Sequence, residues 1–408
     1  MAVTIDDIRA AAALIEGQIL KTPAVRSDSL SKMSGADVVL KLENLQHTSS
    51  FKPRGALVKL LSLSDTEKAA GVVAASAGNH AQGVAFHARN LGIPATIYMP
   101  KRTSFTKVQR TESYGADVAL EGEDLSEAGA LAQAFATANG KHYIHPYNDE
   151  KIITGQGTVG LELIEEFPDL EILIIPIGGG GLIAGSAIAA KALNPDIEII
   201  GVEAALYPSM KGAIDGLPDT SGGQTVAEGI AVKAPGALTR PIIEELVADI
   251  VLVGEAALEN AVQIYLESQR LVVEGAGAAS LAALLDHPER FAGKKVGLIV
   301  SGGNMDSRML STILMRGLVR QGRLARLRIS ITDAPGVLAR VSALIGDNGG
   351  NIVDVYHHRM FYDIPVKLAE MDVVIETQDA SHVTRIIEKL VAAGFQARQL
   401  GGTSQDGG

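Results

Sequence analysis

The 408-residue sequence predicts a larger α/β part with two lobes, followed by a small α+β domain. Three observations support this fold class. From residue 72, short apolar segments alternate with Ala-rich segments of helical spacing, which is typical of parallel sheets covered on both faces. Several of these apolar segments end in Gly or Ser and run directly into a helix, as the binding loops of such sheets do. After Gly322 the order changes to strand, helix, strand, strand, helix, strand.

The composition is that of a globular chain, with 47% hydrophobic and 20% charged residues. A net charge of -11 argues against a nucleic-acid partner. The absence of cysteine excludes disulfides, thiolate metal sites and cysteine nucleophiles, and it fits a reducing compartment. Residues 1–7 are acidic where a signal peptide would be basic, and no apolar run approaches membrane-spanning length. We therefore expect a cytoplasmic protein without a membrane partner.

Taken in order, the chain begins with a helix that Thr4 caps. A strand follows at 38–43, and then a polar loop. Eight strands are more than one compact layer normally holds, so we divide them between two lobes, with the smaller lobe at about 53–149 inserted in a larger part that spans 1–322. The eight strands are expected at 72–76, 95–100, 117–121, 143–145, 171–177, 197–203, 250–253 and 295–300.

The larger part ends with a helix at 309–321, whose arginines indicate a solvated face rather than an anion site. Residues 326–401 then form the small domain. Both of its predicted helices carry apolar residues that share one face, so we expect a ferredoxin-like βαββαβ sandwich. The tail at 402–408 is expected to be disordered.

Lys52 stands out in the segment Ser-Phe-Lys-Pro-Arg-Gly-Ala at 50–56. Pro53 suits the first position of a helix, which places Lys52 at the helix N-terminus. Partial positive charge at that end lowers the pKa of the lysine, and an amine that loses its proton easily can form a Schiff base with an aldehyde cofactor. For this segment alone, a surface lysine beside a helix cap is the commoner explanation.

Three further loops share one design, in which a strand ends in small residues and a helix begins. Gly178, Gly179, Gly180 and Gly181, followed by Leu182, expose amides that suit a phosphate, although a flexible turn is the alternative. The loop Ser-Ala-Gly-Asn-His-Ala-Gln-Gly at 76–83 suits a carboxylate or is only a helix cap. The loop Ser-Gly-Gly-Asn at 301–304 places a hydroxyl where neighbouring loops converge, although an ordinary turn is the alternative.

In this order and at these separations, the four motifs resemble the threonine dehydratase (threonine ammonia-lyase) branch of the fold-type II pyridoxal-phosphate enzymes, over residues 5–320. The resemblance implies a tryptophan synthase β-like catalytic domain. Residues 326–400 resemble an ACT domain, with Asp333-Ala-Pro-Gly336 at the first strand-to-helix turn and Asn351 at the start of the second strand.

The resemblance also implies individual roles at the site. Lys52 would bond covalently to pyridoxal phosphate, with Phe51 beside the ring. Ser301 would face the ring nitrogen, and Glu274 would lie near the ring, although an ordinary acid at a helix start explains Glu274 equally well. Asn79 would bond the ring hydroxyl. The phosphate would be held by Gly178, Gly179, Gly180, Gly181 and Leu182. The substrate would be bound by Ser76, Gly78, Asn79, His80, Asn148 and Gly229.

The implied reaction is the dehydration and deamination of L-threonine to 2-oxobutanoate and ammonia, or of L-serine to pyruvate and ammonia. Lys52 would remove the α-proton.

A serine racemase on the same scaffold is the nearest alternative. The racemases have a serine where this sequence has Ala77, which cannot transfer a proton. They also bind a divalent cation through a Glu and an Asp six residues later, whereas here Glu203 is followed by Ser209, so we expect no metal. A non-catalytic amino-acid sensor is a further alternative, which the retention of Lys52 and all three loops opposes.

For the ACT domain, the resemblance suggests an amino-acid effector such as isoleucine or valine, bound near Asp333, Gly336 and Asn351 across the two-fold interface of a homodimer or homotetramer. A domain that only oligomerises is the alternative. The sequence leaves open the preference between threonine and serine, and whether the role is isoleucine biosynthesis or catabolism.

Overall fold

The computed structural model describes residues 3–358 and 368–401. The chain forms two compact units, Met1–Met305 and Asp306–Gly408. Helix α15 (Ser307–Arg320) belongs to the second unit. The predicted boundary at residue 322 falls at the far end of this helix and stays a prediction. The predicted disordered tail at 402–408 lies outside the described residues.

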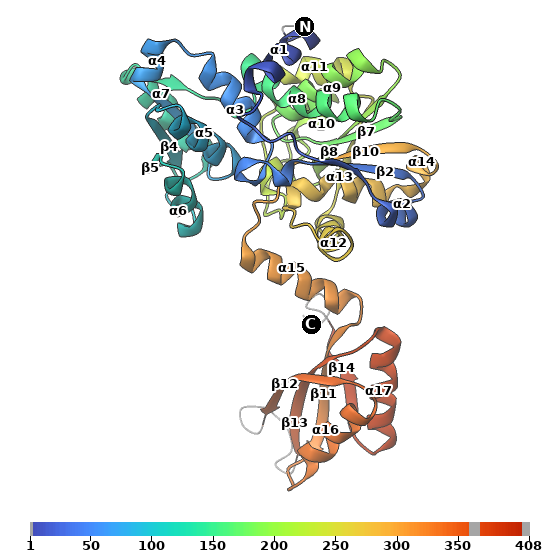
Figure 1. The fold of residues 1–408 in the computed structure, drawn as a ribbon. Helices are drawn as coiled ribbons and strands as arrows, with labels where there is room; N and C mark the ends of the chain where they lie inside the picture. The colour runs from blue at the N-terminus through green and yellow to red at the C-terminus, as the bar shows by residue number, and fades with distance from the viewer. Residues whose placement is uncertain (1–2, 359–367, 402–408) are drawn as a thin grey trace. The chain divides into compact units, whose positions relative to one another are not determined.

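The larger lobe of the first unit is built on a six-stranded sheet with the order β1-β2-β10-β7-β8-β9 (Figure 1). The neighbouring strands are parallel except for the β1-β2 pair. Every residue of β7 is buried, as expected for a strand covered on both faces. The strands are β1 (Ala24–Arg26), β2 (Asp37–Leu42), β7 (Ile172–Pro176), β8 (Glu198–Ala204), β9 (Asp249–Val253) and β10 (Lys295–Val300).

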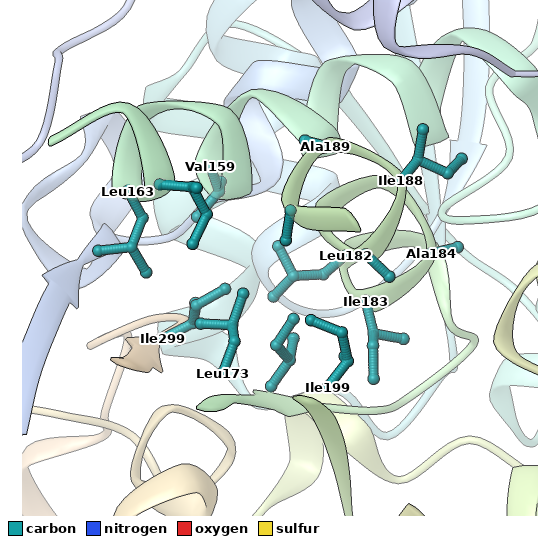
Figure 2. Close-up of a cluster of buried hydrophobic side chains, with 14 of the residues drawn as sticks. Val159, Leu163, Leu173, Leu182, Ile183, Ala184, Ile188, Ala189, Ile199 and Ile299 are labelled. Atoms are coloured by element: carbon teal, nitrogen blue, oxygen red, sulfur yellow. The ribbon is translucent and has the colours of Figure 1, made fainter. Parts of the chain in front are cut away.

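The core of this lobe lies between the sheet and the helices α8 (Glu150–Glu166) and α9 (Gly181–Leu193). Figure 2 shows side chains of both helices meeting those of β7, β8 and β10. The helices approach closely because small residues lie between them: a Cβ atom at Gly185 would lie 2.3 Å from the carbonyl oxygen of Ile153. Helix α13 (Gly275–Asp286) contacts β7, β8, β9 and β10.

The smaller lobe has a four-stranded parallel sheet with the order β5-β4-β3-β6. Helices α5 (Asn79–Asn90) and α7 (Leu125–Ala138) contribute to separate hydrophobic clusters with alternate residues of β3 and so cover opposite faces. The predicted fold class, with parallel sheets in two lobes, is confirmed. The strands are β3 (Val72–Ala75), β4 (Ala95–Met99), β5 (Asp117–Leu120) and β6 (His142–Tyr143).

Thr4 caps the first helix as predicted, because its side chain accepts a hydrogen bond from the Asp7 amide while the Asp7 carboxylate accepts one from the Thr4 amide. None of the helices within the described ranges has the length and apolar character needed to cross a membrane. The other helices of the first unit are α1 (Ile5–Ile15), α2 (Asp28–Ser34), α3 (Lys52–Leu61), α4 (Asp65–Ala70), α6 (Phe105–Ser113), α10 (Ser209–Ile214), α11 (Thr239–Leu246), α12 (Glu255–Ile264) and α14 (Pro288–Phe291). Single turns form η1 (Glu43–Leu45), η2 (His47–Ser49), η3 (Glu228–Ile230) and η4 (Tyr265–Gln269).

The second unit contains an antiparallel four-stranded sheet with the order β12-β13-β11-β14. Its core is formed by apolar residues of β11 and β13 and of the helices α16 and α17. The order of its elements confirms the predicted βαββαβ order. After α15, its elements are β11 (Leu324–Thr332), α16 (Val337–Asp347), β12 (Asn351–His358), β13 (Leu368–Glu376), α17 (Ala380–Ala392) and β14 (Gln396–Gln399).

Candidate active site

A cavity of about 310 Å³ lies in the first unit, at the carboxyl ends of β3, β7 and β10. It brings Lys52 together with the three predicted loops, two of which follow strands of the larger sheet and one a strand of the smaller sheet. The predicted site residues that line it are Phe51, Lys52, Ser76, Gly78, Asn79, His80, Gly178, Gly179, Gly180, Gly181, Leu182, Gly229, Glu274 and Ser301.

Lys52 is the first residue of α3, and Pro53 follows within the first turn. Pro53 was predicted at the first helical position, and the helix instead begins one residue earlier, so that Lys52 still lies at the helix N-terminus. The turn is fixed by two contacts of Phe51: its amide donates to the carbonyl oxygen of Ser301 (3.1 Å), and its own carbonyl accepts from the Arg54 amide (3.1 Å). The Lys52 Nζ donates to the carbonyl oxygen of Pro146 at 3.1 Å.

The pKa of Lys52 is lowered to about 8, mainly by burial, while the Glu274 carboxylate raises it in part. The predicted direction of the shift is therefore confirmed. Its main cause is desolvation in the cavity, whereas the sequence argument relied on the helix N-terminus. An amine with this pKa is partly unprotonated near neutral pH, as a Schiff-base lysine needs to be.

The glycine loop (Gly178–Gly181) connects β7 to α9. Gly180 adopts a φ of +91°, a conformation that residues with side chains rarely take. Within the described residues, the amides of this loop and of Leu182 donate no hydrogen bond to the protein. A Cβ atom at Gly178 would lie 3.2 Å from the Ile230 Cα, so a side chain would crowd the loop. The loop therefore presents a group of unpaired amides at a helix start, as a phosphate site requires.

The asparagine loop (residues 76–80) leads from β3 into α5. The Nδ2 of Asn79 donates to the Oε1 of Glu274 at 2.6 Å, and its Oδ1 accepts from the Nδ2 of Asn304 at 3.0 Å. Burial raises the pKa of Glu274 to about 7, and the bond from Asn79 partly opposes that shift. One network thus joins the asparagine loop to the 301–304 loop and to the start of α13.

His80 is buried beneath the same loop, and its Nε2 lies 3.0 Å from the carbonyl oxygen of Ile144. Because a carbonyl can only accept, Nε2 carries the hydrogen in this contact. Burial and the nearby Lys52 ammonium lower the pKa of His80 to about 3. The imidazole is therefore neutral near pH 7, and it adds no positive charge beside Lys52.

The comparisons with known proteins agree with this geometry. The family model described as "Pyridoxal-phosphate dependent enzyme" matches residues 15–302, and the ACT domain model matches residues 325–392. The chain belongs to the pyridoxal-phosphate dependent enzymes. It is 40% identical to an L-threonine ammonia-lyase of Thermotoga maritima over 98% of this chain and 100% of that protein. It is 42% identical to an L-threonine ammonia-lyase of Geobacter sulfurreducens over 93% of this chain and 94% of that protein.

Two solved structures extend the likeness to three dimensions. Maize serine racemase has a TM-score of 0.73 and 35% identity, covering 78% of this chain and 99% of that one. The processed form of threonine deaminase isoform 2 from Solanum lycopersicum has a TM-score of 0.72 and 34% identity, covering 76% of this chain and 91% of that one.

Pyridoxal phosphate is the cofactor of this family, and the cavity residues fit it. Lys52 offers the amine, and the glycine loop offers unpaired amides in the same cavity. The ring would lie between them, beside Phe51, with Asn79, Glu274 and Ser301 in the same cavity.

Asn148 is the predicted substrate residue that does not line the cavity. Its Oδ1 accepts from the Leu238 amide at 2.8 Å, and its own amide donates to the Nδ1 of His145 at 2.8 Å. Its side chain holds a neighbouring segment in place, and a substrate contact stays a prediction. Gly229 does line the cavity, within η3.

Sequence reasoning assigned no role to Tyr147, Lys107 or Glu228, which also line the cavity. Lys107 on α6 and Glu228 on η3 form an ion pair of 2.5 Å at its edge. No local pattern identified these residues, because each contact joins segments that are far apart in the sequence. The proline after His145 could have indicated a turn, but not the position of the next side chain.

The predicted effector residues lie in the second unit. Gly336 precedes α16 with a φ of +86°, which explains the glycine in this turn. Asp333 lies between β11 and α16. The Nδ2 of Asn351 donates to the Oε2 of Glu376 on the adjacent strand at 3.2 Å. The effector role of these residues stays a prediction.

Among the described residues, no group of three or more His, Asp or Glu side chains is placed to hold a metal ion. The carboxylate of Glu203, where the racemases have a ligand, accepts hydrogen bonds from the amides of Met210 (2.7 Å) and Lys211 (3.0 Å). Burial raises its pKa to about 7, and these amides oppose the shift only in part. The expectation that no metal binds stays a prediction.

Proposed function

We propose that the protein is a pyridoxal-phosphate-dependent L-threonine ammonia-lyase, which converts L-threonine to 2-oxobutanoate and ammonia and acts on L-serine in the same way. One observation carries the proposal: the Lys52 amine, with a pKa lowered to about 8, shares a cavity with the unpaired amides of the glycine loop. The names of the two full-length relatives support it.

In the proposed mechanism, bound pyridoxal phosphate supplies an electron-withdrawing ring that acidifies the substrate α-hydrogen. Lys52 accepts that proton at Nζ, where a pKa of about 8 makes it a suitable base. The carbonyl oxygen of Pro146, 3.1 Å from Nζ, stabilises the resulting ammonium group. The amides of the asparagine loop bind the substrate carboxylate at the start of α5.

Elimination is favoured over racemisation by Ala77, which lines the cavity within the asparagine loop. Racemisation needs a second acid or base on the opposite face of the substrate, and the Ala77 methyl group has no proton to transfer. Lys52 then acts as the base on one face only. The hydroxyl of Ser301 is neutral, and it would not hold a ring nitrogen protonated as an aspartate would.

The test is a paired assay of products and absorbance. We expect 2-oxo acid and ammonia from L-threonine and L-serine, with no D-serine by chiral chromatography. The visible absorbance of the lysine-cofactor imine should vanish in Lys52→Ala and persist in Lys59→Ala, a lysine on the same helix that pairs with Asp149 at 2.6 Å. D-serine as the main product would establish racemisation. Amino-acid binding without imine absorbance in the wild type would establish the sensor alternative.

For the second unit we propose allosteric control by an amino acid such as isoleucine or valine, bound at the turn that contains Asp333 and Gly336 in a homo-oligomer. The ACT domain match supports this regulatory role. Threonine turnover should change when branched-chain amino acids are titrated, and an unchanged rate with all of them would reject allosteric control.

We propose the cytoplasm as the compartment, in line with the cysteine-free sequence, and cell fractionation would test that.

A further inference from the structure

Tyr147 lies directly against the glycine loop. A Cβ atom at Gly179 would lie 2.2 Å from both Cγ and Cδ1 of Tyr147 and 2.3 Å from its Cδ2, so the face of the ring covers the Gly179 Cα. A Cβ atom at Gly181 would also lie 3.2 Å from the Tyr147 Cβ. The glycine at 179 is therefore required by the tyrosine ring, whether or not a phosphate approaches the same atom.

The hydroxyl end of the Tyr147 ring is hydrogen-bonded to the segment 234–239. The ring and this segment both contact the glycine loop. The Tyr147 hydroxyl donates to the carbonyl oxygen of Ala234 at 3.0 Å. Two residues further on, the Gly236 amide donates to the carbonyl oxygen of Gly179 at 3.3 Å, and the Thr239 Oγ1 donates to the same oxygen at 2.7 Å. Gly179 is thus held between the Tyr147 ring and the segment 234–239.

The residues next to Tyr147 reach the other half of the site. The carbonyl oxygen of Pro146 accepts from the Lys52 Nζ, and the Nδ1 of His145 accepts from the amides of Tyr147 (3.2 Å) and Asn148 (2.8 Å). Burial, helped by the nearby Lys52 ammonium, lowers the pKa of His145 to about 4, so this acceptor stays neutral. One short segment between β6 and α8 therefore contacts both the lysine and the glycine loop.

We propose that Tyr147 is a positioning residue. It holds the glycine loop in the conformation that presents its amides, and it fixes the position of that loop relative to Lys52. Glycine has more backbone freedom than any other residue, and this loop has four glycines in succession. That freedom must be lost before the loop amides can bind one anion at the same time. A rigid ring packed on Gly179 removes much of it before the cofactor arrives. The inference rests on the cofactor site of the proposed function.

A double-mutant cycle tests this contact by titrating the apoprotein with pyridoxal phosphate and following imine absorbance. Tyr147→Ala should weaken cofactor binding about tenfold, because the loop gains freedom, and Tyr147→Phe should weaken it less. Gly179→Ala should weaken binding by about tenfold or more, because its methyl group meets the ring. In the double variant Gly179→Ala/Tyr147→Ala, the additional effect of Gly179→Ala should disappear.

Gly180→Ala is the matched control. Its φ of +91° and its contact with the Thr239 side chain do not involve Tyr147, so its effect should be the same with and without Tyr147→Ala. Thermal unfolding of each apoprotein adds a readout without cofactor, in which Gly179→Ala should lower the melting temperature only when Tyr147 is present.

Two results would overturn the proposal. An equal loss of cofactor affinity from Gly179→Ala in both backgrounds would show that the ligand, not the ring, requires this glycine. Tighter cofactor binding by Tyr147→Ala would show that the ring obstructs the loop. If the wild type formed no imine, the proposed function would fail, whereas the unfolding cycle would still decide whether Tyr147 positions the loop.

Discussion

Lys52 and Arg54 are two residues apart on α3, but their surroundings shift their pKa values in opposite directions. Lys52 lines the cavity and contacts a neutral carbonyl group, and burial lowers its pKa to about 8. Burial alone would also lower the pKa of Arg54, but the carboxylates of Glu43 and Glu162 outweigh burial and raise it. Successive helical residues point about 100° apart, so positions two apart face nearly opposite directions.

Arg54 belongs to a network of four charged groups, all buried except the partly exposed Glu162. Arg54 binds Glu43 through Nε and Nη2, both at 2.8 Å, and Glu162 through Nη1 at 2.6 Å. Lys41 completes it with a 2.6 Å bond to Glu162. Two positive and two negative groups balance within this network. A buried charge with partners thus joins β2, α3 and α8, whereas a partly buried amine without a carboxylate bonded to it is left available for chemistry.

Removal of the unpaired amine should have the largest effect on turnover. Lys52→Ala should lower threonine turnover by at least about 10³-fold, because the protein loses both its nucleophile and its base. Stability should change little, because no ion pair is broken. Steady-state assays and thermal unfolding of the apoprotein measure the two effects, and a large loss of stability would contradict the contrast with Arg54.

Removal of the paired cation should have the largest effect on stability. Arg54→Met leaves the buried Glu43 and the partly buried Glu162 with an incomplete set of partners, and we expect a loss of about 3–5 kcal/mol in the free energy of unfolding. Urea unfolding measures this loss, with Arg102→Met, an exposed arginine, as the control. If both variants unfolded at the same urea concentration, the network would not join the elements as we infer.

Glu203 is an intermediate case, since it is buried and bonded to amides but not to a cation. Its pKa is raised from 4.5 to about 7, so its contribution to stability is complete below about pH 4.5 and is lost as the pH rises through about 7. We expect this residue to lower the free energy of unfolding by on the order of 1–3 kcal/mol between about pH 5 and pH 8. Unfolding curves of Glu203→Gln should lack this part of the pH dependence, and an unchanged dependence would assign it to other groups.

The exposed pair Lys107–Glu228 should have the smallest effect. More than a third of each side chain is exposed, so water and salt screen the attraction. Glu228→Gln should change the free energy of unfolding by less than about 1 kcal/mol, with a smaller change at high salt. Urea unfolding at two salt concentrations measures this change in stability. A larger loss of stability that did not depend on salt would mean that the pair is shielded from solvent like a buried pair.

Much of the fold and the site could be predicted because the signals are local. The apolar run before Gly178 and the Ala-rich run after it predict a strand, a loop and a helix, and the structure contains β7, the glycine loop and α9 there. Parallel neighbours β7 and β10 place the glycine loop and Ser301 at the same edge of the larger sheet. Lys52 joins them because the Phe51 amide donates to the Ser301 carbonyl oxygen. Asn148 shows the limit, since its side chain bonds to the distant Leu238 amide.

The sequence by itself determined the order of the elements, the lysine at a helix start and the glycines that expose amides, because periodicity and backbone preference act over a few residues. Only the tertiary structure decided that Lys52 lines a cavity without a carboxylate bonded to it, while Arg54 has two, and that Tyr147 covers Gly179. Desolvation and packing depend on residues that chain folding brings together from distant positions, and no local pattern specifies those neighbours.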